Sequence, residues 1–131
     1  MNILIIDDSD DDILLTQMIL KKIGKKITVE SALSGEAGLA LLRSGSFRPS
    51  LILLDMKMPG MDGLAFLRAV RADERFSPIP VVIVTHSDLE SDKETSYANG
   101  ASGFLCKSID LDRFAEDLQR VLNQRLGEIP D

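Results

Sequence analysis

Residues 51–63 read Leu51-Ile52-Leu53-Leu54-Asp55-Met56-Lys57-Met58-Pro59-Gly60-Met61-Asp62-Gly63. The four apolar residues at the start of this segment predict a strand buried on both faces, as in a parallel sheet. Asp55 follows the strand directly, and the proline and glycines after it predict a loop. In open α/β sheets, ligands bind outside the carboxyl ends of the strands. Asp55 is therefore predicted to lie at a functional edge of the sheet.

The composition indicates one globular domain with an acidic surface. The chain has 131 residues, of which 44% are hydrophobic, and a net charge of −6. This charge argues against nucleic acid as a partner, because phosphates are held mainly by clustered Lys and Arg. No apolar run reaches the roughly 18 residues that a membrane helix needs, and the N-terminus does not resemble a signal peptide. The single cysteine, Cys106, favours the cytoplasm. We expect a domain over residues 1–126 and a short tail over 127–131.

Strands and helices alternate five times along the chain. Apolar runs predict strands at 2–6, 27–29, 51–54, 81–84 and 102–106. Helical spacing of apolar residues predicts helices at about 9–22, 34–45, 63–72, 87–100 and 110–126. This alternation predicts an α/β fold with a parallel sheet covered on both faces. With right-handed crossovers, the flavodoxin-like (βα)5 doubly wound sheet with strand order 2-1-3-4-5 fits best.

Two helix starts carry capping signals. Ser9 is followed three residues later by Asp12, which predicts a cap with Asp12 as its reciprocal partner. Ser87 and Glu90 predict a similar capping box for the fourth helix. That fourth helix is unusually polar, so we expect it to be the least stable and the most readily moved. Its few predicted apolar anchors are Leu89, Tyr97 and Ala98.

Polar side chains end four of the predicted strands. Asp7 and Asp8 follow the first strand, Asp55 the third, Thr85 the fourth and Lys107 the fifth. Three neighbouring carboxylates repel one another and raise each other's pKa unless a cation joins them. Magnesium fits best, because it takes one or two carboxylates with waters and phosphate oxygens. The strand ends therefore predict an acidic Mg²⁺ site.

Such a site suits phosphoryl transfer to a carboxylate. Positioned cations stabilise the charge on the phosphoryl oxygens in the transition state, and Asp55 is the candidate nucleophile. Taken singly, the same residues have structural interpretations. Asp7 and Asp8 could cap a helix, Lys107 could be a solvated loop residue, and Thr85 could cap a strand end. The coincidence of all five at predicted strand ends favours the functional interpretation.

With these residues assembled, the sequence resembles the receiver domain of two-component response regulators, of the single-domain chemotaxis type, from Ile3 to about Leu126. The motifs that carry the resemblance are Ile6-Asp7-Asp8, Leu53-Leu54-Asp55, Met58-Pro59-Gly60-Met61-Asp62-Gly63, Val84-Thr85, Gly100-Ala101 and Leu105-Cys106-Lys107. The acidic run at 7–12, Pro78-Ile79-Pro80 and Ser87-Asp88 are similar to stand-alone receivers that partner bacteriophytochrome kinases.

The resemblance implies a chemical role for each motif. Asp55 would accept a phosphoryl group from a sensor histidine kinase or a histidine phosphotransfer protein. Asp7, Asp8 and Asp55, with the backbone carbonyl of Lys57, would bind Mg²⁺, and Lys107 would pair with the phosphoryl oxygens. The protein would be a regulatory phosphoacceptor rather than an enzyme, supporting its own phosphotransfer and slow autodephosphorylation.

The resemblance also implies a conformational switch. Thr85 would move to hydrogen-bond the phosphoryl group, and Phe104, where a tyrosine is often found, would rotate inward by packing alone. Because no effector domain follows in the sequence, output is expected by protein contact. The expected surface comprises the fourth helix, the last strand and the last helix, read by an unidentified target protein or by a second copy in a homodimer.

Several residues flank the predicted site or depart from the family pattern. Met56, Lys57, His86 and Ser87 lie next to Asp55 or Thr85. We expect Lys57 and Ser87 to tune the lifetime of the phosphoryl group. His86 either narrows access and alters hydrolysis or is a loop imidazole without a role. The family's lysine is usually followed by proline through a cis bond. Here Ser108 follows Lys107, so this peptide is either trans or strained, since a non-proline cis bond costs about 3–4 kcal/mol.

Three alternative functions are considered. A phosphohydrolase of the haloacid dehalogenase kind also uses an aspartate nucleophile, but it needs an acid/base Asp where this chain has Lys57. A flavodoxin-like electron carrier shares the fold, but the acidic loop after the first strand would repel a flavin phosphate. Within the receiver class, a phosphorelay intermediate or a phosphate sink remains the alternative to an effector.

Overall fold

The computed structural model describes residues 1–24, 26–107 and 110–126 and contains a single five-stranded parallel sheet in the order β2-β1-β3-β4-β5. The strands are β1 (Asn2–Ile6), β2 (Thr28–Ala32), β3 (Leu51–Leu54), β4 (Val81–Thr85) and β5 (Gly103–Cys106). The helices are α1 (Asp10–Ile23), α2 (Gly35–Ser44), α3 (Gly63–Ala72), α4 (Glu90–Ala98) and α5 (Leu111–Leu126). The predicted flavodoxin-like fold and strand order are confirmed.

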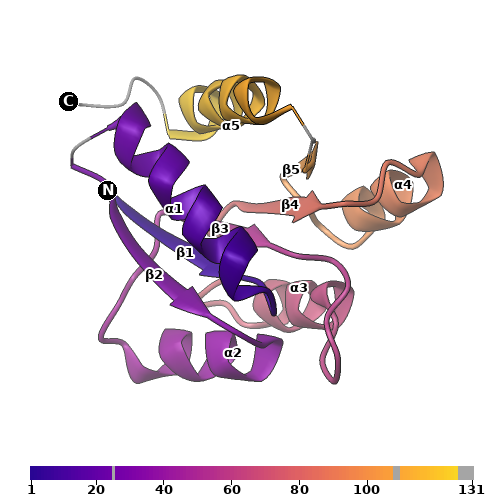
Figure 1. Ribbon diagram of the computed structural model, residues 1–131. Coiled ribbons are helices and arrows are strands. Elements are labelled where there is room, and N and C mark those ends of the chain that lie inside the picture. The colour runs from indigo at the N-terminus through magenta and orange to yellow at the C-terminus, as the bar shows by residue number, and fades with distance from the viewer. Residues whose placement is uncertain (25, 108–109, 127–131) are drawn as a thin grey trace.

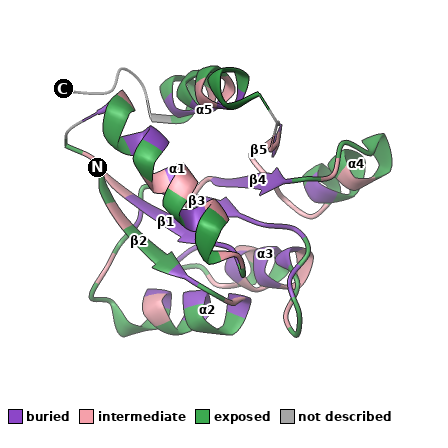
Figure 2. Ribbon diagram, viewed as in Figure 1, coloured by how far each residue is buried: buried purple, intermediate pink, exposed green. Residues whose placement is uncertain are grey.

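Helices cover the sheet on both faces (Figure 1). Alternate residues of each central strand enter two separate cores. In β3, Leu51 and Leu53 pack towards α1 and α5, whereas Ile52 and Leu54 pack towards α2 and α3. Figure 2 shows β3 and β4 as buried throughout, β1 as buried beyond its first residue, and the outer surfaces of the helices as exposed. This double burial explains why these strands read as continuous apolar runs. Among the described residues, no helix is long and apolar enough to cross a membrane.

The edge strand β2 differs from its prediction. It was expected at residues 27–29, but it spans Thr28–Ala32 and pairs with β1 as far as Ile6 opposite Ala32. Glu30 and Ser31 are exposed, so no apolar pattern marks this part of the strand. Backbone pairing with β1 extends β2 beyond its apolar residues.

The fourth helix is the second point of difference. The predicted capping box is wrong, because Leu89 occupies the N-cap position without a side-chain bond to the helix. Ser87 donates its hydroxyl hydrogen bond to Asp92 instead. The predicted anchors Leu89 and Tyr97 are 56% and 45% exposed, and Ser96 is the buried residue of α4. The helix is therefore attached even more weakly than its sequence indicates, which suits a segment that moves.

Arg71, at the end of α3, connects the loop before β4 with the loop between α4 and β5. Its guanidinium donates to the carbonyls of Gly100 at 2.9 Å, Ser77 at 3.0 Å and Ile79 at 2.8 Å. Gly100, in turn, ends the α4 segment with a φ of 99°. A Cβ atom at Gly100 would lie 3.0 Å from the Arg71 side chain. The C-terminal end of α4 is thus fixed by Arg71, whereas at its N-terminal end Asp92 contacts Ser87 and Lys57 through side chains alone.

Candidate functional site

The carboxyl ends of β1 and β3 bring three acidic side chains together. The two strands pair with Ile6 opposite Leu54, and the Asp55 amide donates to the Ile6 carbonyl at 2.8 Å. Asp7 and Asp55 therefore leave the sheet side by side. Carboxylate oxygens of Asp7, Asp8 and Asp55 all lie within 4.8 Å of one another. Strand register, rather than local sequence, creates this predicted cluster.

The loop that follows Asp55 returns tightly against it. The Gly63 amide donates to the Met56 carbonyl at 2.9 Å, and a Cβ atom at Gly63 would lie only 2.3 Å from the Asp55 carbonyl oxygen. Asp62 caps α3 by accepting from the Ala65 amide at 2.8 Å. Only glycine fits this close approach, which fixes the backbone beside Asp55.

A cleft of about 720 Å³ lies over these strand ends, between the loops after β1, β3 and β4. Most of the predicted site residues line it. The lining residues are Asp7, Asp8, Ser9, Asp11, Asp12, Asp55, Lys57, Thr85, His86, Ser87, Asp88 and Leu89. The cleft is rich in side-chain oxygen atoms that could serve as metal ligands.

Lys107 is buried beneath the acidic cluster. Its side chain is 8% exposed, and its ammonium donates to Asp7 at 2.5 Å and to Asp12 at 2.9 Å. Burial acts to lower the pKa of Lys107, but the hydrogen bonds to Asp7 and Asp12 and the charge of Asp55 together raise it above its ordinary value. Lys107 is therefore a permanent cation at neutral pH.

The ionised form of Asp55 is disfavoured by its surroundings. Burial, followed by the charges of Asp7 and Asp8, outweighs the opposing charge of Lys107 and raises the pKa of Asp55 above its ordinary value. One lysine thus leaves the cluster short of positive charge. Three carboxylates without nitrogen or sulfur donors are the ligand type that Mg²⁺ prefers. The residues present fit a hard divalent cation.

The predicted switch residues lie on neighbouring strands. Thr85 is buried; its carbonyl accepts from the Lys107 amide at 2.6 Å, and its hydroxyl accepts from the Ser87 amide at 3.4 Å. Phe104 pairs with Ile83 across β4 and β5. Its ring is partly buried against the core on the α2 and α3 side. The hydrogen bond between the Thr85 carbonyl and the Lys107 amide thus connects the end of β4 to Lys107 through the backbone.

The flanking residues separate into two groups. Lys57 and Ser87 line the cleft and meet at Asp92 of α4, which lies 3.9 Å from the Lys57 ammonium and accepts from the Ser87 hydroxyl. Met56, although adjacent to Asp55, is buried, and its sulfur lies 4.0 Å from the Ser96 hydroxyl. The Lys107–Ser108 peptide and the predicted tail 127–131 lie outside the described residues.

Asp12 is a site residue that the sequence analysis did not identify. It was predicted to reciprocate the Ser9 cap, and Ser9 does cap α1 by accepting from the Asp12 amide at 3.2 Å. The Asp12 carboxylate, however, turns to Lys107 and His86. Side chains in the first turn of a helix point back towards its N-terminus. This geometry was the available signal that Asp12 faces the strand ends.

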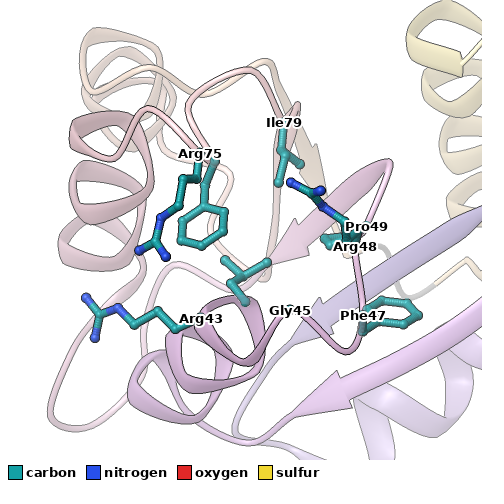
Figure 3. Close-up of a pocket in the computed structure, with 9 residues that line it drawn as sticks. Arg43, Gly45, Phe47, Arg48, Pro49, Arg75 and Ile79 are labelled. Carbon is teal, nitrogen blue, oxygen red and sulfur yellow. The ribbon is translucent and has the colours of Figure 1, made fainter.

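A second cavity lies near the amino ends of β3 and β4, away from the acidic cleft. Arg43, Arg48 and Arg75 line a cavity of about 290 Å³ together with apolar residues such as Ile79, and Figure 3 shows these side chains. None of the predicted site residues lines it. The candidate functional site is therefore the acidic cleft.

Comparison with known proteins gives one consistent family. The sequence model of one protein family, the response regulator receiver domain, matches residues 3–119 of the chain. Protein PilH of Pseudomonas aeruginosa is 35% identical over 120 residues, which cover 92% of this chain and 96% of that protein. The chemotaxis protein CheY of the same organism is 34% identical over 128 residues, covering 97% of this chain and 100% of CheY.

Solved structures extend the similarity to further response regulators, one of them a phytochrome response regulator. The phosphorylated cyanobacterial phytochrome response regulator RcpA superposes with a TM-score of 0.86 and is 28% identical, covering 95% of this chain and 93% of RcpA. The Mn²⁺-bound form of response regulator Rcp1 superposes with a TM-score of 0.83 and is 31% identical, covering 93% of this chain and 91% of Rcp1.

Proposed function

The chain belongs to the response regulator receiver domain family, and from this premise we propose that Asp55 accepts a phosphoryl group from phosphohistidine. The family is regulatory rather than catalytic, and receiver domains accept phosphoryl groups from histidine kinases. The single observation that carries the assignment to Asp55 is the meeting of three carboxylates at one cleft, with the buried Lys107 ammonium bound to one of them, Asp7. The donor would be a sensor histidine kinase or a histidine phosphotransfer protein.

The proposed transfer uses the described geometry. A bond forms between a carboxylate oxygen of Asp55 and the phosphorus, while the phosphorus–nitrogen bond breaks and its electron pair stays on the imidazole. Lys107 supplies a fixed positive charge to the transferred group. Receiver domains bind Mg²⁺ at an acidic cluster, and we assign this role to Asp7, Asp8, Asp55 and the Lys57 carbonyl. When bound, Mg²⁺ neutralises charge on the phosphoryl oxygens.

Phosphorylation would then act as a switch. The phosphoryl group offers acceptors to Lys107 and to the Thr85 hydroxyl, and movement of Thr85 would shift the loop that leads to α4. A modification shifts populations only through its different contacts in the two states. The weak attachment of α4 keeps the cost of this movement small, and Phe104 would follow by repacking. The output surface is proposed to comprise α4, β5 and α5, contacting a target protein or a second copy of the chain.

The competing functions have less support. In a phosphohydrolase, the position of Lys57 would hold an acid/base group facing the reaction, whereas the Lys57 side chain is 70% exposed and lies near Asp92. No nitrogen-rich anion site occurs beside β1 for a flavin phosphate among the described residues. A phosphorelay intermediate or phosphate sink would use the same acceptor, and it differs only in whether phosphate passes onward. The cytoplasmic location stays a prediction.

Beryllofluoride, a mimic of a bound phosphoryl group, tests this function. Because Tyr97 on α4 is the single tyrosine and the chain has no tryptophan, its fluorescence reports on α4 directly. We expect beryllofluoride to change this fluorescence only with Mg²⁺ present, and Asp55→Asn to abolish the response. A response that persists in Asp55→Asn, or that does not require Mg²⁺, would contradict the proposal. Transfer of phosphate onward to a histidine phosphotransfer protein would instead identify a relay intermediate.

A further inference from the structure

The Asp12 carboxylate lies between two nitrogen donors from distant parts of the chain. Its Oδ2 atom accepts from the Lys107 ammonium at 2.9 Å and lies 3.1 Å from Nε2 of His86. Burial acts to raise the pKa of Asp12, but the hydrogen bonds and charges of Lys107 and His86 lower it below its ordinary value. The carboxylate is therefore ionised and can only accept, so the proton of this contact resides on His86 Nε2. Phosphoryl acceptance as proposed above makes no use of either Asp12 or His86.

Both residues that must approach a phosphoryl group are connected to Asp12. The Lys107 ammonium is shared between Asp7 and Asp12. Thr85 is followed directly by His86, whose ring contacts Asp12, and the Thr85 carbonyl accepts from the Lys107 amide. Movement of Lys107 towards a phosphorylated Asp55 would break one contact with Asp12. Movement of Thr85 that carried His86 with it would break the other.

We propose that Asp12 is a positioning residue that holds Lys107, and through His86 the Thr85 segment, in the unphosphorylated arrangement. This inference rests on the proposed function and assigns a regulatory role within the same site. A charge-assisted hydrogen bond is stronger than a neutral one, so two such bonds on one oxygen favour the resting state. His86 is then part of this contact and not a loop imidazole without a role.

Asp11 is a matched control for Asp12. It lies in the same first turn of α1, lines the same cleft, and carries the same charge. It is exposed, and no hydrogen bond or ion pair links it to Lys107 or His86 among the described residues. Asp11→Asn therefore reproduces the change in net charge and in helix-terminal charge, but not the loss of the contact with Lys107.

The test is the affinity for beryllofluoride in saturating Mg²⁺, measured by Tyr97 fluorescence. Releasing Lys107 in Asp12→Asn should tighten binding about tenfold, equal to about 1.4 kcal/mol. Asp11→Asn should stay within about twofold of wild type. His86→Ala should tighten binding by about threefold, whereas His86→Gln, which keeps an N–H donor, should resemble wild type. The double variant Asp12→Asn/His86→Ala should bind beryllofluoride as tightly as Asp12→Asn alone, because both substitutions disrupt the same contact between Asp12 and His86.

The outcomes separate this inference from the proposed function. Unchanged or weaker binding in Asp12→Asn overturns the positioning role, and so does an Asp11→Asn effect of equal size, which would indicate long-range charge. If Asp12 had a purely structural role, Asp12→Asn would lower the melting temperature of the protein without tightening beryllofluoride binding. Asp12→Ser is a second variant in which the same two quantities separate a positioning role from a structural one. If wild-type protein shows no Mg²⁺-dependent response at all, the proposed function itself fails.

Discussion

Replacing Asp55 with asparagine should stabilise the protein when divalent cations are absent. Carboxylate oxygens of Asp7, Asp8 and Asp55 lie within 4.8 Å of one another, and two unit charges at that distance repel by about 3.5 kcal/mol at an effective dielectric constant of 20. Lys107 offsets part of this repulsion, and solvent screens the exposed Asp8. We expect a net gain of about 1–2 kcal/mol in the free energy of unfolding. For a domain of this size, each kcal/mol raises the melting temperature by about 4 °C.

The stabilisation should depend on pH with a defined sign. Burial and the neighbouring acids raise the pKa of Asp55 in the folded state. A raised carboxyl pKa means that ionisation of Asp55 costs stability, and this cost appears as the pH rises through the folded-state pKa. The advantage of Asp55→Asn should therefore be full at neutral pH. It should disappear below the ordinary carboxyl pKa of 3.8, where Asp55 is protonated in both states.

Thermal denaturation followed by circular dichroism measures this effect, with EDTA present at neutral pH and again at acidic pH. Asp11→Asn is the control, because it removes one exposed acid from the same cleft. Adding Mg²⁺ should raise the melting temperature of the wild type more than that of Asp55→Asn, because a ligand stabilises the state that binds it. An Asp55→Asn variant no more stable than wild type at neutral pH in EDTA would refute the reasoning.

Three further substitutions test the architecture around the site. Lys107→Met leaves buried Asp7 unpaired and should cost about 3 kcal/mol in urea denaturation; a loss below about 1 kcal/mol would show that Asp7 does not need this partner. Arg71→Ala leaves three carbonyls without a donor and should cost about 2 kcal/mol, with faster hydrogen exchange at the end of α4; unaltered exchange there would exclude Arg71 as its anchor. Gly63→Ala sets a Cβ atom 2.3 Å from the Asp55 carbonyl oxygen and should cost about 2–3 kcal/mol, whereas wild-type stability would mean that the loop relaxes freely.

The fold could be predicted where burial produces a recognisable pattern of apolar residues in the sequence. Strands β1 and β3 and helix α3 match their predicted bounds, because double burial or a strong apolar face leaves a periodic pattern. The edge strand β2 and helix α4 were predicted less well. The extent of β2 depends on backbone pairing with β1, and the start of α4 on the hydrogen bond between Ser87 and Asp92, and neither interaction leaves an apolar signature.

The site, too, contains residues that could be predicted from the sequence and residues that could not. Topology alone predicts that residues following parallel strands meet at one edge, which is how Asp7, Asp55 and Lys107 could be grouped. Asp12 could not be found in this way, because its partner Lys107 lies 95 residues further along the chain. Local sequence offered a capping role for Asp12, and the tertiary ion pair replaced it. The hydrogen bond from Ser87 to Asp92 escaped prediction for a different reason. The two residues are only 5 apart in the chain, but the sequence pattern favoured a capping box with Glu90, which the structure does not contain.

Mapping the acyl phosphate tests the central claim most directly. Protein incubated with acetyl phosphate and Mg²⁺ can be reduced with borohydride, which converts an aspartyl phosphate to homoserine, and then analysed by peptide mass spectrometry. We predict homoserine at position 55 only, its absence when EDTA replaces Mg²⁺, and no labelling of the Asp55→Asn variant. Homoserine at Asp7, Asp8 or another position, or no acyl phosphate at all, would contradict the assignment of Asp55 as the phosphoryl acceptor.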